Sequence, residues 1–294
     1  MSVTADDQAG DFAIDLRGIR LWTPERIDIL RGVDWSVRRG EQWALLGPNG
    51  SGKSTLLSVA GAWRHPSAGD ATVLGGRFGR TDMQTLRTKI GVVDASQKVL
   101  GWLTVEEIAL TGTTATLRPL WDRYGEAERA RAREMLDLVG VAGLADRPIS
   151  TCSQGERQRA RIARALMTEP DLLLLDEPAV GLDLPAREAL IAAVGDLAAA
   201  RPDLTTVLVT HHLEELPPST THALLLRSGE VVAAGPVAET LTAEHVSACF
   251  GFPVAIESID GRWFARSAGS WRRTGAPAES GWVPSEPLGD DEGF

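Results

Sequence analysis

The sequence predicts an α/β protein with a mostly parallel sheet, a smaller antiparallel sheet at its start and a helical insertion in its middle. Short apolar segments alternate with segments of helical periodicity along most of the chain. Two strand-like segments follow one another directly at the start, and a glycine-rich loop comes after the third. Strands that alternate with helices favour a parallel sheet covered on both faces, whereas consecutive strands favour antiparallel pairing.

Length and composition indicate a globular protein. The chain has 294 residues, enough for one large domain or two small ones, with 43% apolar and 24% charged residues. Its net charge of -10 argues against nucleic acid as the main partner. The 2 cysteines exclude a disulfide framework and are typical of an intracellular protein. We expect neither a secretory signal nor a membrane-spanning segment.

The first part of the chain is predicted to consist mainly of strands. Residues 11–22 and 27–37 have strand composition and are separated by a turn at Pro24. A short buried strand over 41–47 leads into the glycine loop, and a helix begins at Lys53. Further strands are expected over 70–76 and 89–95.

The stretch between residues 98 and 167 is predicted to be an inserted helical subdomain. Ser153 is a good N-cap for the last of its helices. Helices are expected over 104–112, 127–141 and 153–167. The last helix carries arginines that are expected to form a solvated face, namely Arg157, Arg159, Arg161 and Arg164.

The remainder of the chain alternates between strands and helices again. A helix is predicted over 184–200, with Pro185 in its first turn, where proline is tolerated. Strands are expected over 171–178 and 205–212, and hairpins over 223–235 and 253–267. We therefore expect a main domain over 11–245, a small β appendage over 246–268 and a flexible tail over 269–294.

The segment GPNGSGKST, residues 47–55, matches the phosphate-loop pattern G-x-x-x-x-G-K-[ST]. Its glycines allow successive backbone N–H groups to face an anion, and the following helix adds its positive dipole end. Lys53 is expected to reach the β- and γ-phosphates, Ser54 to bind Mg²⁺ and Thr55 to contact another phosphate. The other loop residues expected to bind ATP are Gly47, Pro48, Asn49, Gly50, Ser51 and Gly52. The alternative is a glycine turn that only caps a helix.

Two carboxylates end the buried apolar strand LLLLDEP, residues 172–178. Asp176 is expected to hold Mg²⁺, and Glu177 to align a water with the γ-phosphate. Without the upstream phosphate loop, the same residues could form an acidic helix start or a solvated turn.

The segment CSQGE, residues 152–156, places Ser153 and Gly155 at the start of a helix. Such a start presents backbone N–H groups, a hydroxyl and a dipole to an anion. By itself this pattern indicates only an ordinary helix cap.

Taken together and in this order, these segments resemble those of the ATP-binding cassette (ABC) ATPases. GPNGSGKST resembles the family's Walker A loop, CSQGE its LSGGQ signature and LLLLDEP its Walker B strand. PAVGLD resembles the D-loop and VTHH the switch segment, which assigns Asp183 to ATP binding and His211 to catalysis. Trp22 lies where the family keeps an aromatic residue that stacks on adenine. The alternative for Trp22 is that it only packs as a strand residue. The alternative for His211 is that it is a hydrogen-bonded residue at the end of a strand.

The resemblance implies an ABC-type P-loop fold and a head-to-tail homodimer around two ATP–Mg²⁺. Ser153 and Gly155 would then contact the ATP held by the other chain, while Lys53, Glu177 and His211 would be catalytic. The implied function is ATP hydrolysis that powers a membrane transporter. The subunit would be cytoplasmic and held at the inner face of the cell membrane by a permease, with no nucleic-acid partner.

One segment departs from the family pattern. In IGVVDASQ, Asp94 and Ala95 stand where the family's glutamine is expected, and Gln97 follows two residues later. We expect Gln97 to serve as the additional Mg²⁺ ligand.

Two alternative functions remain open. One is a stand-alone soluble ABC protein acting on the ribosome, on DNA or as a regulator, and the other is a phosphotransferase with a phosphate loop.

Overall fold

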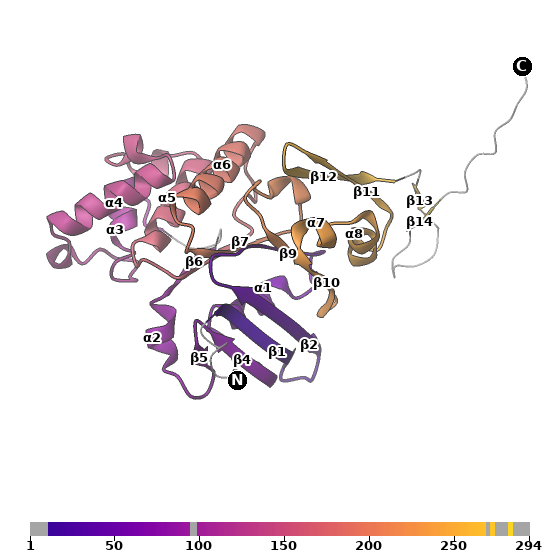
Figure 1. Ribbon diagram of the computed structural model, residues 1–294. Helices are drawn as coiled ribbons and strands as arrows, with labels where there is room; N and C mark the ends of the chain where they lie inside the picture. Colours follow the sequence, from indigo (N-terminus) through magenta and orange to yellow (C-terminus); the bar gives the residue numbers. More distant parts are fainter. Residues whose placement is uncertain (1–10, 95–98, 269–270, 274–281, 285–294) are drawn as a thin grey trace, which may run out of the picture.

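A mixed sheet forms the centre of the computed structural model, which describes residues 11–94, 99–268, 271–273 and 282–284 (Figure 1). Its 6 strands lie in the order β10-β9-β3-β8-β7-β6. The parallel members are β3 (Gln42–Leu46), β6 (Ile90–Asp94), β7 (Leu172–Asp176), β8 (Thr205–Thr210) and β9 (His222–Arg227), and β10 (Glu230–Pro236) is antiparallel to β9. The predicted α/β class with a mostly parallel sheet is confirmed.

The expected antiparallel sheet lies beside the central one and holds 4 strands in the order β2-β1-β4-β5 (Figure 1). They are β1 (Phe12–Trp22), β2 (Asp28–Arg38), β4 (Ala68–Val73) and β5 (Gly76–Arg77). Leu16 of β1 is the register partner of Trp35 of β2, and both side chains are buried. Alternate residues of these strands face the core, as expected for a sheet with one solvated face.

The Walker B-like strand β7 contributes to two separate cores. Leu172 and Leu174 pack in the core shared with the antiparallel sheet and with α1 (Lys53–Ala60). Leu173 and Leu175 pack in the core shared with the helical insertion. Successive strand residues point to opposite faces, so a continuous apolar run is needed where both faces of the sheet are covered.

The helical insertion lies at the left in Figure 1 and contains three of the predicted helices. They are α3 (Val105–Leu110), α4 (Glu126–Leu138) and α5 (Gln154–Leu166). A buried carboxylate, Glu106 of α3, lies 3.3 Å from Arg129 and 3.1 Å from Arg133 of α4. This pairing of charges links the two helices, because a buried carboxylate is tolerated only with such partners.

The expectation of a solvated arginine face on α5 is wrong for three of its residues. Burial lowers the pKa of Arg161, whose Nη1 donates to Gln158 Oε1 at 3.0 Å. Arg164 donates a 2.9 Å hydrogen bond from Nε to Thr111 Oγ1 in the loop after α3, and burial lowers the pKa of its guanidinium. Arg157 donates to the carbonyl groups of Ile149 and Ser150, at 2.9 and 2.6 Å. These arginines therefore bind neighbouring backbone and side-chain oxygens and do not only face solvent.

The C-terminal part contains elements that were predicted and others that were not. The helix α6 (Leu184–Ala200) and the hairpin of β11 (Val254–Ile259) and β12 (Arg262–Ser267) lie where expected. The expected boundary at 245/246 falls inside α8 (Ala243–Phe250), which packs against β9 and β10. Also unpredicted are α2 (Met83–Arg87), α7 (Val237–Thr240), β13 (Trp271–Arg273) and β14 (Trp282–Pro284).

Among the described helices, none combines the length and apolar character needed to span a membrane.

Replacement of Leu174 by alanine tests the packing of β7. Leu174 is fully buried, at 0% exposure, so Leu174→Ala should lower the free energy of unfolding by about 2–5 kcal/mol. Urea titration followed by circular dichroism measures this change. Leu117→Ala is the matched control, because Leu117 is 55% exposed and should change stability by less than about 0.5 kcal/mol. Equal losses for the two variants would contradict the assignment of Leu174 to the core.

Candidate functional site

The candidate site lies at the carboxyl edge of the central sheet. Parallel register pairs Leu46 with Thr210, and it pairs Asp176 with both Asp94 and Val209. The segments that leave β3, β7 and β8 at this edge carry the glycine loop, the acidic pair and the two histidines. Such an edge is where ligands bind in open α/β sheets.

The glycine loop connects β3 to α1, and its lysine bonds back to the start of the loop. Lys53 is only 5% exposed, and its Nζ donates to the carbonyl oxygens of Gly47 at 2.9 Å and Pro48 at 3.1 Å. The N-cap of α1 is Gly52, which provides no side-chain acceptor for the first amides of the helix. Those backbone N–H groups and the ammonium group together form a cradle for an anion.

Segments outside the motif support this loop from behind. A Cβ on Gly47 would lie 2.0 Å from the carbonyl oxygen of Leu226 at the end of β9. In the β9–β10 turn, the amide of Gly229 donates to the carbonyl of Ser51 at 2.9 Å. A Cβ on Gly52 would meet the carbonyl oxygen of Ile29, on β2, at 3.2 Å. The sequence motif did not identify these supports, although the glycines themselves signal close approach of backbone.

Ser54 and Asp176 bring two oxygen ligands together. The Ser54 hydroxyl donates to Asp176 Oδ1 at 3.4 Å. Burial raises the pKa of Asp176, the bond from Ser54 opposes this, and the negative charge of Asp94 adds to it. Burial also lowers the pKa of Lys53, against the effect of the neighbouring Glu177 and Asp176 charges.

These two oxygens fit a hard divalent cation such as Mg²⁺. Among the described residues, no group of three or more His, Cys, Asp or Glu side chains could hold a metal ion alone. Mg²⁺ typically takes one or two carboxylates and completes its shell with water and substrate phosphates, so the small donor set suits it. The other expected ligand, Gln97, lies outside the described residues. Asp94 and Trp63 line a pocket of about 430 Å³ beside Ser54 and Asp176.

Glu177 and His211 face each other across the ends of β7 and β8. Glu177 Oε1 lies 3.4 Å from His211 Nδ1, and both side chains are partly exposed. Glu177 has a left-handed backbone with φ 46°, held by the bond from its amide to the Val209 carbonyl at 3.0 Å. Such strain in a non-glycine residue is often found at functional sites. His211 Nδ1 has no hydrogen-bond partner among the described residues, which does not support a purely structural strand-end role.

The signature-like segment forms a capped helix start that packs against α6. The Ser153 hydroxyl accepts from the Glu156 amide at 3.3 Å, and the Glu156 carboxylate accepts from the Ser153 amide at 2.7 Å. A Cβ on Gly155 would lie 2.8 Å from the Ala186 Cβ. Asp183 caps α6 by accepting from the Ala186 amide at 3.0 Å. No hydrogen bond of the described part of the chain joins these residues to the glycine loop.

Trp22 is the last residue of β1. Its side chain is half-buried and is not part of either core. The guanidinium of Arg26 lies over the ring, 5.4 Å from its centroid.

Comparisons with known proteins indicate the family of the chain. A family model described as ABC transporter matches residues 30–180. The chain is 42% identical over 231 residues to the uncharacterized ABC transporter ATP-binding protein YlmA of Bacillus subtilis, covering 78% of this chain and 87% of that protein.

Two solved structures are also similar. One is cbiO1 from Clostridium perfringens, part of the ABC transporter complex cbiONQ, with 25% identity, a TM-score of 0.71 and coverage of 81% of this chain and 94% of that one. The other is the dimeric post-hydrolysis state of the ATP-binding cassette MJ0796 bound to ADP and Pi, with 27% identity, a TM-score of 0.65 and coverage of 76% and 98%.

The close approach at Gly47 yields a stability prediction. A Cβ at this position would lie 2.0 Å from a backbone oxygen, so Gly47→Ala should lower the free energy of unfolding by about 1–3 kcal/mol. Gly195→Ala is the matched control, because Gly195 lies in α6 with no atom within 4 Å of the added Cβ. That variant should stabilise the protein by up to about 1 kcal/mol. Chemical denaturation measures both changes, and an unaltered Gly47→Ala protein would refute the contact with Leu226.

Proposed function

The chain belongs to the ABC transporter family as an ATP-binding, ATP-hydrolysing cassette, and from this premise we propose which of its residues bind and hydrolyse ATP. The observation that carries the proposal is the convergence of three contacts at one sheet edge. They are Lys53 with its glycine loop, Ser54 with Asp176, and Glu177 with His211.

The glycine loop binds the phosphates of ATP. The ammonium of Lys53 and the first amides of α1 neutralise charge on the β- and γ-phosphates. Thr55, one residue beyond Ser54 on α1, contacts a phosphate nearer the nucleoside. Trp22 stacks on adenine, and its half-buried position at the end of β1 is compatible with a ring that keeps a face for a ligand.

Ser54 and Asp176 would hold the Mg²⁺ that accompanies ATP. When bound, Mg²⁺ supplies positive charge next to the phosphate oxygens. The supporting observation is the 3.4 Å contact between the two side chains, next to the phosphate cradle. Gln97 is retained as a further candidate ligand on the sequence evidence alone.

Glu177 and His211 carry out the hydrolytic step. Glu177 accepts a hydrogen bond from a water and takes up its proton as the water oxygen attacks the γ-phosphorus. The bond from the γ-phosphorus to the β–γ bridging oxygen breaks, which gives ADP and phosphate. His211 contacts the γ-phosphate and keeps the Glu177 carboxylate oriented through the 3.4 Å contact. The left-handed backbone of Glu177 supports this assignment, because strained non-glycine residues are concentrated at functional sites.

A second copy of the chain completes each ATP site. In a head-to-tail homodimer, Ser153 and Gly155 contact the γ-phosphate bound by the partner, and Asp183 lies at the same interface. Two observations support this. Ser153 is exposed at the start of α5, and no hydrogen bond of the described residues joins it to the glycine loop of its own chain. The cassette MJ0796 is dimeric with ADP and Pi.

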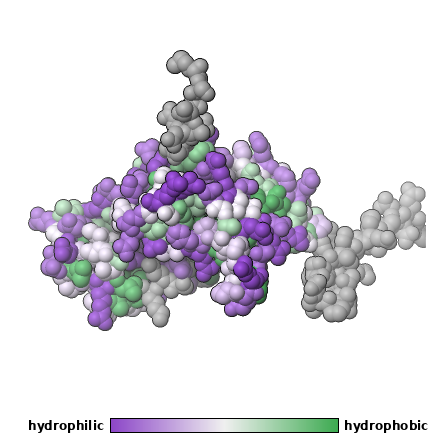
Figure 2. Space-filling view, turned by 90° about the horizontal axis from the view of Figure 1, so that it is seen from below, coloured by the Kyte–Doolittle hydropathy of each residue, from purple (hydrophilic) through white to green (hydrophobic). Residues whose placement is uncertain are grey.

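A membrane permease contacts the helical insertion and holds the subunit at the cytoplasmic face of the membrane. Large apolar side chains are exposed there, including Trp102 at 64%, Leu117 at 55% and Trp121 at 48%. Figure 2 shows hydrophobic patches within a largely hydrophilic surface at this end of the molecule. Relatives named as transporter ATP-binding proteins favour this function over a stand-alone soluble ABC protein.

Replacement of Glu177 by glutamine tests the hydrolytic role. Glu177→Gln keeps the shape of the side chain but removes the carboxylate that accepts the proton from water, so ATP should still bind. Turnover should fall by about 100-fold or more, and the ATP-bound dimer should accumulate in size-exclusion chromatography. Glu169→Gln is the control, because Glu169 pairs with Arg131 and precedes the start of β7, whereas Glu177 follows its end. Normal turnover in Glu177→Gln would disprove the role of this carboxylate.

Replacement of Lys53 by alanine tests phosphate binding. Lys53→Ala removes a charge-assisted contact and should weaken ATP binding by about 1.5–3 kcal/mol in titration calorimetry. Lys89→Ala removes an exposed lysine just before β6 and should leave the affinity for ATP unchanged. Equal affinities of the Lys53→Ala and unmodified proteins would reject the phosphate contact.

A further inference from the structure

Arg262 lies outside every sequence motif but binds two elements of the candidate site. It is the first residue of β12, in the C-terminal hairpin. Its Nη1 and Nη2 lie 2.7 and 3.2 Å from the two carboxylate oxygens of Glu188, and Nη2 also donates to the carbonyl of Glu214 at 2.6 Å. The side chain is only 18% exposed. A two-point arginine–carboxylate pair with a third bond is geometrically specific and stronger than an ordinary surface pair.

The two partners of Arg262 belong to segments that carry ATP-site residues. Glu214 lies in the short turn η4 (Leu213–Glu215), three residues after His211. Glu188 lies in the second turn of α6, the helix that Asp183 caps. One side chain thus fixes the segment of His211 and the start of α6 to the same point of the hairpin.

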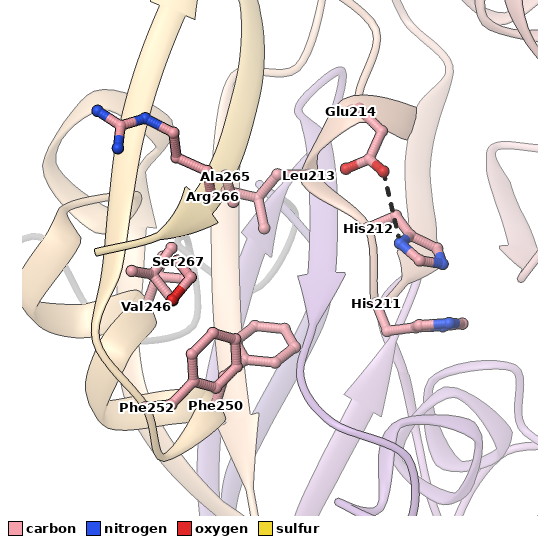
Figure 3. A pocket seen from close by; sticks show the side chains of 11 residues that line it. His211, His212, Leu213, Glu214, Val246, Phe250, Phe252, Ala265, Arg266 and Ser267 are labelled. Atoms are coloured by element: carbon pink, nitrogen blue, oxygen red, sulfur yellow. Dashed lines mark ion pairs between the residues drawn. The ribbon is translucent and has the colours of Figure 1, made fainter. Parts of the chain in front are cut away.

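A hollow beside this contact makes the bonds of Arg262 important for the His211 segment. The hairpin and the segment 211–214 line a pocket of about 240 Å³ (Figure 3). In Figure 3, Ala265 and Ser267 lie on the hairpin side, and His212 and Glu214 on the other. A space of this size holds several water molecules, so the packing between the hairpin and the segment is incomplete here. Leu213 is buried in the core with Val246 and Val254, and Arg262 adds a polar anchor to this packing. On either side of the segment, the Thr210 hydroxyl bonds to the buried carboxylate of Glu215.

We propose that Arg262 is a positioning residue for ATP hydrolysis and acts through His211. By binding the Glu214 carbonyl and Glu188, it holds the segment 211–214 so that His211 Nδ1 faces Glu177. The C-terminal hairpin is then part of the hydrolytic unit. This inference rests on the role proposed above for His211. Small displacements of catalytic groups are costly, because a shift of about 1 Å can reduce a rate by about 100-fold.

The first experiment measures kcat and ATP affinity in Arg262 variants of the full chain. Arg262→Gln should lower kcat about five- to tenfold and change the Kd for ATP by less than about twofold. Arg262→Lys should recover part of kcat, because lysine keeps the charge but cannot form the two-point pair. Arg266→Gln is the matched control, since Arg266 lies on the same strand, is 68% exposed and bonds Glu257 within the hairpin. Its kcat should stay within about twofold of the unmodified protein.

The second experiment combines Arg262→Gln with His211→Ala in a double-mutant cycle. If Arg262 acts through His211, adding Arg262→Gln to His211→Ala should lower kcat further by less than about twofold. Independent, multiplicative losses would overturn the proposal, and so would equal kcat values for Arg262→Gln and Arg266→Gln. Normal turnover in His211→Ala would instead refute the role of His211 itself. Low turnover in His211→Ala with normal turnover in Arg262→Gln would refute only the positioning role.

Glu188→Gln provides a second route if Arg262→Gln does not fold, as judged by circular dichroism. It weakens the two-point anchor on α6 that orients the guanidinium toward the Glu214 carbonyl, so the proposal requires a loss of kcat. A loss of kcat that disappears in the His211→Ala background supports the proposal, and an unchanged kcat overturns it.

Discussion

The parallel register of β3, β8, β7 and β6 is the constraint on which the rest of the site depends. Because these strands run in the same direction, their last residues end at one edge of the sheet. Each strand end contributes one kind of group, namely the lysine of the glycine loop after β3, the carboxylates of Asp176 and Glu177 at the end of β7, and the histidines after β8. An antiparallel neighbour would move one of these groups to the opposite edge, more than a strand length away. The parallel direction of these strands is therefore a condition for the chemistry as well as for the fold.

The site is held in place mainly by parts of the chain that do not touch a substrate. The Leu226 carbonyl and the Gly229 amide lie directly against the glycine loop, so the β9–β10 hairpin determines where the cradle sits. Burial of Lys53 lowers the pKa of its ammonium group. The negative charges of Glu177 and Asp176 raise this pKa again and so offset part of the effect of burial. The C-terminal hairpin has a comparable proposed role, because Arg262 of β12 binds the Glu214 carbonyl next to the His211 segment.

The sequence was sufficient wherever local patterns decide the outcome. The apolar run from Leu172 to Leu175 and the glycine loop each have a physical meaning that holds in any tertiary context, and both lie where predicted. Contacts between distant segments were not predictable in this way. Arg164 has the same sequence signature whether it is solvated or bonded to Thr111, and only the packing of α3 on α5 distinguishes the two cases. The short helices α2 and α8 do carry local signals that the prediction overlooked, namely the N-caps Asp82 and Thr242 and the left-handed glycine Gly251 after α8.

Ser153 shows how one residue can serve the local structure and still be available to a ligand. A serine hydroxyl has one donor and two acceptor positions. In the cap of α5, Ser153 Oγ acts as an acceptor for the Glu156 amide, so its hydrogen is not used by that bond. The close packing of Gly155 on Ala186 fixes the direction of the helix start relative to Asp183. An ordinary helix cap and a phosphate contact are therefore compatible in the same residue, and the cap would supply rigidity to the proposed contact with a second chain.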